Sequence, residues 1–434
     1  MNNASDTLRI EVGDMPVGDD VVAIDVKQAP EHRLAYDGLV LDARLRQSLV
    51  TVRSLGRRGL LVAALETLRN VPTFSSRWCQ RSFVCPADEG TEEYLSFLEQ
   101  LLDRSGARVL IASSDGTIAL IRQHRKRLEE RVRIALAKES ALEAAINKEQ
   151  TLEIAQGLGL GIPRGMKLEA VSEVPVALRE IGLPAVVKPV QSWWSDEQRG
   201  ARLICKLVTT PDEARDAVEV LTSSGGSILF QQFLSGRREA VHLLYAQGEI
   251  YARFAQWAKR AQPPLGGTSV LRQSIAVPVD IGEQAERLVR ELDLEGYCEV
   301  EFRRDDAGNP YLMEVNPRLS ASVEVAVRAG VNFPYLLYQW ASGDHIDRVM
   351  SYRVGGWMRY LEGDIITTIQ AISERGRPGV TPPTRAILDF FASFFIPMGY
   401  DYFDWEDPFP ACAAAAEFGR SLPKRLGTLT KKKP

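Results

Sequence analysis

The sequence predicts an α/β fold that begins with a Rossmann-like domain and later carries a β-hairpin bearing two carboxylates and an amide. Across residues 19–140, apolar runs suited to strands alternate with runs of helical spacing. Such alternation is typical of a parallel sheet covered by helices on both faces. Further along, the β-rich runs 299–303 and 311–318 flank a segment of Asp, Gly and Asn residues, which favours a turn.

The elements expected in the first domain follow one another in a regular order. Residues 1–18 are polar and acidic, and we expect them to be a disordered lead-in. After them, apolar runs and helical spacings predict four strands and three helices. The strands are expected at 21–25, 60–65, 83–85 and 108–112, and the helices at 45–56, 94–106 and 117–138.

A polar stretch follows the fourth expected strand. In open α/β sheets, ligands gather at the carboxyl ends of the strands. Ser113, Ser114 and Asp115 are therefore candidate contacts for a substrate other than a nucleotide. The alternative is that Asp115 only caps the helix that follows. Because the first strand is not followed by a G-x-G-x-x-G motif, dinucleotide binding is not indicated.

Charge and composition argue against several classes of protein. The 434 residues include 53 Lys and Arg against 57 Asp and Glu, a balance that gives no sign of a nucleic acid or an anionic membrane partner. No apolar run approaches the ~20 residues of a membrane span, and no signal peptide is recognisable. The 5 cysteines lack C-x-x-C spacing, so reduced thiols in a cytoplasmic protein are expected.

The hairpin gathers chemistry-bearing side chains. Its first strand carries Glu301, and its second carries Glu314 and Asn316, which are two residues apart and so share one face. Two carboxylates and an amide form an all-oxygen set of the kind that Mg²⁺ takes, with nucleotide phosphates completing the coordination. The alternative is a solvated hairpin whose acids are ordinary surface charges.

The sequence Glu-Val-Asn-Pro-Arg, with Val-Glu-Phe on the partner strand, resembles the metal-binding hairpin of the ATP-grasp superfamily. The resemblance implies that Glu301, Glu314 and Asn316 hold the magnesium ions, or Mn²⁺ in their place, that bridge the phosphates of ATP. Arg318 matches an arginine of the carbamoyl-phosphate synthetase and biotin carboxylase branch. There it faces the reacting phosphoryl group or acyl intermediate, so Arg318 is a candidate catalytic residue.

Further ATP-grasp landmarks occur upstream in the family's order. Lys148 opens a helix before a Gly/Pro break, and Lys188 ends the apolar strand 183–189. A lysine is costly to bury there without an anion, and the resemblance assigns both lysines to the nucleotide phosphates. The nucleoside contacts that it implies are the adenine-facing Gln231 and Gln232, the backbone N–H of Leu234, and the ribose-binding Glu239. Glu239 could instead be an outward position of the next strand, and His242 is expected to be structural.

Two more segments correspond to mobile parts of the family's site. Trp193 and Trp194 lie where many ATP-grasp enzymes have a glycine-rich lid, and they either shield the reaction or pack at the lid's base. The segment 259–269 combines a basic pair with prolines, glycines and hydroxyls, so we expect an anion-binding loop. Arg260 is its candidate catalytic residue, and the alternative is a solvated loop.

The resemblance also divides the chain. It implies an ATP-grasp fold of two α+β subdomains over residues 141–345, after a Rossmann-like domain at 19–140, and it leaves 346–434 as a C-terminal extension. The aromatic run 390–395 in that extension is too short to cross a bilayer. It is interpreted either as core or as a subunit interface, and the latter would fit a homodimer.

The implied enzyme is an ATP-dependent ligase that joins a small-molecule carboxylate to an amine. Carboxylates are poor electrophiles, and transfer of the γ-phosphoryl group gives an acyl phosphate that an amine can attack, with release of ADP and phosphate. This transfer needs positioning and charge neutralisation rather than a protein nucleophile. The alternatives are an ATP-grasp kinase, a carboxylase acting through carboxyphosphate, and a non-catalytic ATP-binding module used for assembly.

Overall fold

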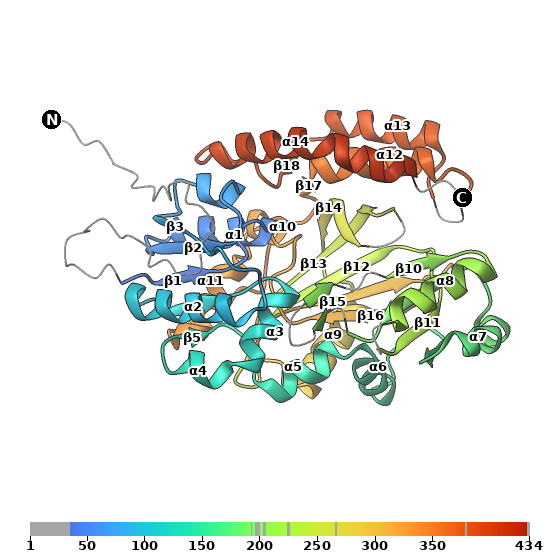
Figure 1. Cartoon of the computed structure of the whole chain (residues 1–434), viewed down its shortest axis with the longest axis horizontal. Coiled ribbons are helices and arrows are strands. Elements are labelled where there is room, and N and C mark those ends of the chain that lie inside the picture. Colours follow the sequence, from blue (N-terminus) through green and yellow to red (C-terminus); the bar gives the residue numbers. More distant parts are fainter. Residues whose placement is uncertain are drawn as a thin grey trace, which may run out of the picture.

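The computed structural model of the chain contains three main sheets and a set of C-terminal helices (Figure 1). A first, parallel sheet lies at one end of the molecule, and a small antiparallel sheet with its helices lies at the other. A large sheet runs between them. The structure describes residues 35–191, 193–195, 200–202, 205–223, 226–264, 267–377 and 380–431.

The first sheet has five strands in the order β3-β2-β1-β4-β5. Its strands are β1 (Gly38–Val40), β2 (Val62–Glu66), β3 (Arg81–Val84), β4 (Val109–Ile111) and β5 (Arg133–Ile134). Every neighbouring pair is parallel, as the alternation of strands and helices predicted. The strand expected at 21–25 lies outside the described residues, and the short β1 occupies the centre of this sheet.

The helices that accompany this sheet are α1 (Arg46–Gly56), η1 (Pro72–Ser75), α2 (Glu92–Ser105), α3 (Asp115–Gln123) and α4 (Arg125–Glu129). The ends predicted for α1 and α2 are close to the observed ones. Gly106 ends α2 with a φ of 56°, a conformation that glycine adopts without steric cost.

The single helix expected over 117–138 is wrong. The chain leaves the helical conformation at His124, where φ is −113° and ψ is 21°. After the short α4 it enters β5, which adds an edge strand to the sheet by pairing with β4. The pairing between strands therefore overrides a local pattern that favours helix, because tertiary context outweighs the small differences in helix propensity.

A small antiparallel sheet follows, in the order β10-β7-β11-β6. The connecting helices are α5 (Glu139–Ile146) and α6 (Lys148–Gly157), and Lys148 opens α6 as predicted. The strands are β6 (Gly165–Leu168), β7 (Ala185–Pro189), β10 (Lys206–Val208) and β11 (Ile228–Gln232). The remaining helices are η2 (Val171–Glu173), α7 (Val174–Ile181) and α8 (Pro211–Thr222). Between β7 and β10, β8 (Trp193–Ser195) and β9 (Gly200–Arg202) pair as a separate two-stranded ribbon.

The large sheet has seven strands in the order β16-β15-β12-β13-β14-β17-β18. Its strands are β12 (Arg238–Ala246), β13 (Glu249–Gln262), β14 (Thr268–Ile275), β15 (Gly296–Arg304), β16 (Pro310–Asn316), β17 (Trp357–Arg359) and β18 (Met398–Tyr400). The expected hairpin is the β15–β16 pair at one edge. At the other edge, β17 and β18 come from the predicted C-terminal extension, so that segment continues this sheet.

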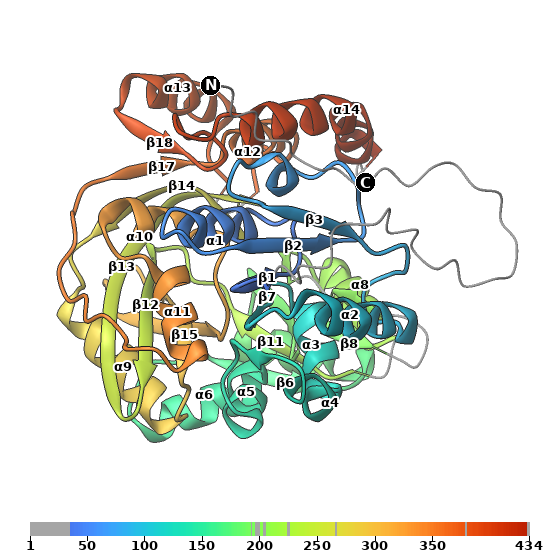
Figure 2. The same ribbon diagram turned by 90° about the vertical axis from the view of Figure 1, so that its left-hand side faces the viewer.

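The helices after β14 are α9 (Val279–Glu291), α10 (Glu324–Ala329), α11 (Phe333–Ser342), α12 (Leu361–Ser373), α13 (Pro383–Ala392), η3 (Ser393–Phe395) and α14 (Phe409–Lys431). Figures 1 and 2 both show α12, α13 and α14 along one side of the molecule, beyond β17 and β18. None of the described helices is long and apolar enough to cross a membrane.

The aromatic run at 390–395 is only partly in the core. Phe390 and Phe394 both pack against the guanidinium group of Arg359, but Phe391 and Phe394 are exposed and Phe395 is 88% exposed. A core position is therefore wrong for these three side chains. An interface with a second copy of the chain stays a prediction.

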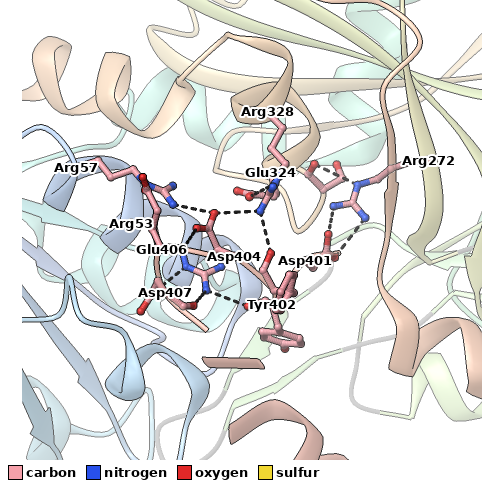
Figure 3. Close-up of polar contacts among 12 residues, drawn as sticks. Arg53, Arg57, Arg272, Glu324, Arg328, Asp401, Tyr402, Asp404, Glu406 and Asp407 are labelled. Atoms are coloured by element: carbon pink, nitrogen blue, oxygen red, sulfur yellow. Dashed lines mark hydrogen bonds and ion pairs between the residues drawn. The ribbon is translucent and has the colours of Figure 1, made fainter. Parts of the chain in front are cut away.

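An acidic tail segment, residues 401–408, links β18 to α14 and lies among arginines from distant parts of the chain (Figure 3). Asp401 lies 2.5 Å from Arg272 of β14, and Asp407 lies 2.9 Å from Arg53 of α1. These four side chains are buried. The tail segment thus ties the first sheet's helices to the large sheet.

Apolar packing also joins the hairpin to the first sheet. One continuous cluster contains Leu110 of β4, Leu142 of α5 and Phe302 of β15. The small sheet has a cluster of its own, which includes Val187 and Phe230. The hairpin that bears the carboxylates therefore shares a hydrophobic core with the first sheet. The small sheet has a separate core.

Candidate active site

The register of the hairpin places its polar side chains on one face. Glu301 is directly opposite Glu314, and Glu299 is directly opposite Asn316. Beyond Glu301 the register shifts by one residue, so that Met313 is an extra residue on β16. Such bulges re-aim side chains next to functional sites. Here the bulge lies next to Glu314, and the ladder is regular from Glu314 to Asn316.

The amide of Asn316 lies at the centre of this group. Its Nδ2 is 3.3 Å from Glu299 Oε2, 3.4 Å from Glu301 Oε1 and 3.5 Å from Glu314 Oε1. The structure therefore brings together the three residues that the sequence assigned to a metal. It also adds a fourth, Glu299, which the sequence interpretation missed.

Glu299 could have been found from its spacing. It precedes Glu301 by two residues on one strand, and residues two apart share a face. Its Oε1 accepts hydrogen bonds from Ser322 Oγ at 3.2 Å and Gln256 Nε2 at 3.3 Å, and His242 Nε2 lies 3.4 Å away. Burial raises the pKa of Glu299. As predicted, His242 is structural: it is buried behind the acids, and Tyr297 Oη lies 2.6 Å from its Nδ1.

The carboxylates differ in their electrostatic surroundings. Burial raises the pKa of Glu301 to about 8, and Glu314 and Glu299 add to that rise, although Arg238 lies 2.5 Å away and opposes it. Burial also acts to raise the pKa of Glu314, but nearby lysines and arginines outweigh it and lower the pKa. The four cations are Lys148, Lys188, Arg238 and Arg318.

The two predicted phosphate lysines lie near the hairpin. Lys148 is the first residue of α6, and its backbone N–H donates to the carbonyl of Val190 at 3.1 Å. Lys188 is on β7 of the small sheet, opposite Leu229. Both lysines are buried. Burial lowers the pKa of Lys188, and the charge of Lys148 contributes to the decrease.

A cleft of about 340 Å³ opens beside the hairpin, between α3, α5, α6, β8 and β16. At one place in its wall, Arg318 Nε donates to Asp115 Oδ1 at 2.6 Å. Asp115 thus contributes to the cleft as the sequence suggested, although Ser114 rather than Asp115 caps α3. The residues that line the cleft are Asp115, Ile118, Ala119, Arg122, Gln123, Glu139, Ala145, Ile146, Lys148, Gln191, Trp193, Glu314, Val315, Asn316, Pro317 and Arg318.

The oxygen-bearing side chains of the hairpin fit a magnesium ion that also binds phosphate. Among the described residues, no three His, Cys, Asp or Glu side chains by themselves enclose a metal position. Magnesium usually takes one or two protein carboxylates and leaves the other positions to phosphates and water. Burial, and then the charges of Glu314 and Glu299, raise the pKa of Glu301, and a bound divalent cation would oppose this rise by stabilising the ionised carboxylate.

The nucleoside-binding residues expected from the sequence lie on two different sheets. Gln231 is buried at the end of β11, Gln232 accepts a hydrogen bond from Arg164 Nε at 2.8 Å, and Leu234 is buried just beyond. Glu239 is on β12, opposite Phe302. Since Ala240 is the residue opposite Glu301, Glu239 points to the other face of the sheet from the hairpin carboxylates.

Glu239 therefore stands apart from the acid cluster. Its carboxylate lies 2.7 Å from Arg304 and 3.0 Å from Arg237, and it is buried between them. These two ion pairs satisfy it without a ligand. Its predicted contact with a ribose stays a prediction that this geometry does not support.

The expectation for the segment 259–269 needs correction. Its first residues are not in a loop, because β13 continues to Gln262 and pairs with β14. Arg260 donates to both carboxylate oxygens of Asp364 on α12 at 2.6 Å, and to Ser393 Oγ at 3.0 Å. Arg260 therefore lies between the large sheet and the C-terminal helices rather than at the hairpin, and its catalytic role stays a prediction that this position does not support.

The ribbon of β8 and β9 reaches the first domain. The ring of Trp193 lies so close to Gly116 of α3 that a Cβ on Gly116 would be 2.6 Å from it. Trp193 also lines the cleft, so it packs against α3 and forms part of the cleft wall, while its shielding of the reaction stays a prediction. The side chain of Trp194 lies outside the described part of the structure.

Comparisons with known proteins agree on one superfamily. A family model described as "ATP-grasp in the biosynthetic pathway with Ter operon" matches residues 227–362. The carbamoyl phosphate synthase large chain of Methanoculleus marisnigri is 26% identical over 220 residues, which are 48% of this chain and 20% of that protein. The D-alanine–D-alanine ligase of Nitrosospira multiformis is 24% identical over 217 residues, which are 46% of this chain and 68% of that protein.

A solved structure matches a larger share of the chain. The biotin carboxylase domain dimer of the Hydrogenobacter thermophilus 2-oxoglutarate carboxylase, in complex with MgADP, ADP and bicarbonate, superposes with a TM-score of 0.59. The match covers 74% of this chain and 73% of that one at 15% identity, which shows a common fold. The chain spans only about a fifth of the carbamoyl phosphate synthase that it matches.

Proposed function

The chain is an ATP-grasp protein, and we propose that it is an ATP-dependent ligase that joins a small-molecule carboxylate to an amine with release of ADP and phosphate. The observation that carries the proposal is the convergence of buried carboxylates, lysines and Arg318 at one end of a cleft. That arrangement supplies the charge neutralisation that phosphoryl transfer to a carboxylate requires.

The hairpin side chains and the two lysines have separate roles in this reaction. Glu301, Glu314 and Asn316 would hold the magnesium ions, which neutralise the phosphate charge when bound. Lys148 and Lys188 bind the phosphates of ATP. A substrate carboxylate oxygen attacks the γ-phosphorus, and the bond to the ADP oxygen breaks. An amine then attacks the acyl carbon, and phosphate leaves with the electron pair of the C–O bond.

Arg318 acts on the substrate side of the site. Its guanidinium group belongs to the wall of the cleft, immediately after the strand that carries Glu314 and Asn316. A cation there attracts the substrate carboxylate and stabilises the negative charge that develops as the acyl phosphate forms and is attacked. No side-chain nucleophile or general base from the chain is assigned.

Three alternatives use the same fold. A carboxylase would activate bicarbonate, which is present in the solved biotin carboxylase complex, and would pass its carboxyl group to an acceptor, whereas a kinase would stop at phosphoryl transfer. The requirement for an amine separates both from the ligase in the test below. A non-catalytic ATP-binding module would not need the buried acids and Arg318 to converge on the cleft, so this convergence favours an enzyme.

The identity of the nucleotide product tests the proposal. Pools of carboxylates and amines are added with Mg·ATP, and the products are identified by mass spectrometry. We expect ADP and phosphate to form only when a carboxylate and an amine are both present. Formation of AMP and pyrophosphate would contradict the proposal, because it indicates adenylation instead.

A further inference from the structure

We infer that Arg238 controls metal binding at the hairpin: it pairs with Glu301, so that a divalent cation binds weakly by itself and tightly only together with the phosphates of a nucleotide. Arg238 is thus a positioning residue. The inference rests on the proposed function, because it concerns the metal that the hairpin acids would hold. It begins from the contacts of the Arg238 guanidinium group, which belongs to β12.

Arg238 already uses the carboxylate of Glu301. Its Nε and Nη2 both donate to Glu301 Oε2, at 3.0 and 2.5 Å. The other oxygen, Oε1, accepts a hydrogen bond from Asn316 Nδ2 at 3.4 Å. Magnesium binds oxygens at about 2.1 Å, and a second cation on the same oxygen as the guanidinium group is strongly repelled at such short range. The metal and Arg238 therefore compete for one carboxylate.

The guanidinium group is held by more than Glu301. Its Nη1 donates to the carbonyl oxygen of Gly267, just before β14. The side chains of Arg238 and Glu301 are only 20% and 10% exposed. Burial by itself would lower the pKa of this arginine, but the charges of Glu301, Glu314 and Glu299 outweigh burial and raise it. Arg238 is therefore a fixed cation that acts on all three acids with little screening by water.

The protein's own cations balance these acids. Each of the three acids carries at most one negative charge. Arg238 faces Glu301, and Lys148 and Lys188 help to lower the pKa of Glu314 against the effect of burial. A divalent cation that binds alone thus adds uncompensated positive charge beside three cations that water screens poorly. The phosphates of a nucleotide bring the matching negative charge and also supply metal ligands.

Metal and nucleotide binding should therefore be strongly coupled, each raising the affinity of the protein for the other. Removal of the Arg238 charge eliminates the competing cation and leaves Glu301, Glu314 and Asn316 in the chain. The metal alone should then bind more tightly. If Arg238 instead bound a nucleotide phosphate directly, its removal would weaken nucleotide binding and leave the affinity for the metal alone unchanged.

The test measures the affinity for Mn²⁺ in the absence of nucleotide, by calorimetry and by EPR. We expect Arg238→Met to bind Mn²⁺ about tenfold or more tightly than the wild type, because like charges held close together are strongly unfavourable. Arg238→Lys keeps the charge and should bind Mn²⁺ as weakly as the wild type does. Mn²⁺ binding by Arg238→Met that is equal to that of the wild type, or weaker, would overturn the inference.

Two further variants show which charge matters and where the metal binds. Arg237→Met is the matched control, because this neighbouring arginine is 43% exposed and pairs with Glu239, on the other face of the sheet. It should bind Mn²⁺ as the wild type does. Addition of Glu314→Gln to Arg238→Met should remove the gained affinity. A gain that Arg237→Met shares, or that persists in the double variant, would overturn the inference.

The wild type provides a test that does not depend on the folding of a variant. A ligand that binds the folded state raises Tm. Mn²⁺ should raise Tm little by itself and much more when ADP is present, relative to ADP alone. Equal increases with and without ADP would overturn the inference. None of these measurements requires turnover. If no pair of carboxylate and amine releases ADP, the proposed ligase fails, and the Mn²⁺ results still decide the role of Arg238.

Discussion

At the scale of single residues, the site consists of hairpin acids supported by a buried polar layer. Glu299 is held by Ser322 and Gln256, and His242 lies behind it in contact with Tyr297. These contacts fix the orientation of the carboxylate without exposing it to water. A preorganised set of buried charges is what a phosphoryl-transfer site needs, because little reorganisation then occurs during the reaction.

His242 should make the fold sensitive to acid. Burial, and then the charge of Arg272, lower the pKa of His242 from 6.5 to about 3. The unfolded chain binds this proton below pH 6.5, whereas the folded chain does not bind it until about pH 3. The free energy of unfolding should therefore decrease as the pH falls through this window, by up to about 1.4 kcal/mol per pH unit.

The measurement is urea unfolding of the wild type and His242→Gln at several values between pH 7.5 and 4.5. The variant should lose stability less steeply with falling pH, while the buried carboxylates contribute equally to both proteins. Identical slopes would show that His242 takes up a proton in the folded state.

Single residues also show where sequence interpretation succeeds and fails. The clustering of Glu301, Glu314 and Asn316 could be predicted because a hairpin is local and its side-chain period is two. Glu299 was available to the same rule. The position of Arg260 could not be predicted in this way. Its partner Asp364 comes from a helix 104 residues further along the chain, and no local pattern specifies that contact.

At the scale of elements, the site depends on how strands and helices meet. On β12, Glu239 lies one residue away from the position that faces the hairpin acids. Because adjacent residues point to opposite faces, its side chain points away from those acids. The β8–β9 ribbon, in contrast, reaches across to α3 and places Trp193 against Gly116. This contact lies next to Asp115, so the position of the ribbon and the shape of the cleft are linked.

Gly116→Ala should disturb this contact. Its Cβ would lie 2.6 Å from the ring of Trp193, so the ring must move. We expect the tryptophan emission to shift and turnover to fall by roughly 10- to 100-fold, the scale on which small misplacements act, while ADP affinity changes little. Gly157→Ala is the matched control, because nothing lies within 4 Å of its Cβ. Equal behaviour of the two variants would contradict a role for the contact.

The tryptophans should also report nucleotide binding. Lids close over ligands to exclude water, so Mg·ATP should change the fluorescence, and Trp193→Phe combined with Trp194→Phe should remove most of that change. The comparison is between the two proteins, because the chain has 7 tryptophans in all. An undiminished change in the double variant would assign these residues to static packing.

The elements were predicted unevenly, for physical reasons. Helices with clear end signals, such as α2 with Gly106, were placed well. The strand β5 was mistaken for the end of a helix because it forms only by pairing with β4, which lies far from it in the local pattern. The strand β1 has only three residues, too few for a periodic pattern, and its place at the centre of the sheet comes from its two neighbours.

At the scale of the whole molecule, the tail segment 401–408 connects parts that are far apart in sequence. Asp407 accepts hydrogen bonds from Arg53 Nε at 2.9 Å, from Ser76 Oγ at 2.7 Å and from the N–H of Arg77 at 2.9 Å. Figure 3 shows Asp407 beside Arg53, with further tail acids facing other arginines. The C-terminal part thereby fastens the first domain to the large sheet that carries the hairpin.

Asp407→Ala should destabilise the protein strongly. Removing one partner of a buried ion pair leaves the other charge uncompensated, which typically costs about 3–5 kcal/mol. Glu406→Ala is the control, because Glu406 is 67% exposed and such surface pairs contribute at most about 1 kcal/mol. Thermal and urea unfolding of both variants provides the comparison. Similar small losses for both would mean that the tail segment does not hold the molecule together.

The central claim is that the hairpin is the metal and phosphate site of a ligase, and Glu314→Gln tests it most directly. The substitution keeps the shape of the side chain and removes the charge that faces Lys148 and Lys188. ADP release at saturating Mg²⁺ is measured beside ATP binding by calorimetry. We expect turnover to fall by at least ~100-fold, the usual cost of removing one electrostatic contact from a transition state, while ATP affinity falls modestly. Turnover equal to that of the wild type would contradict the account.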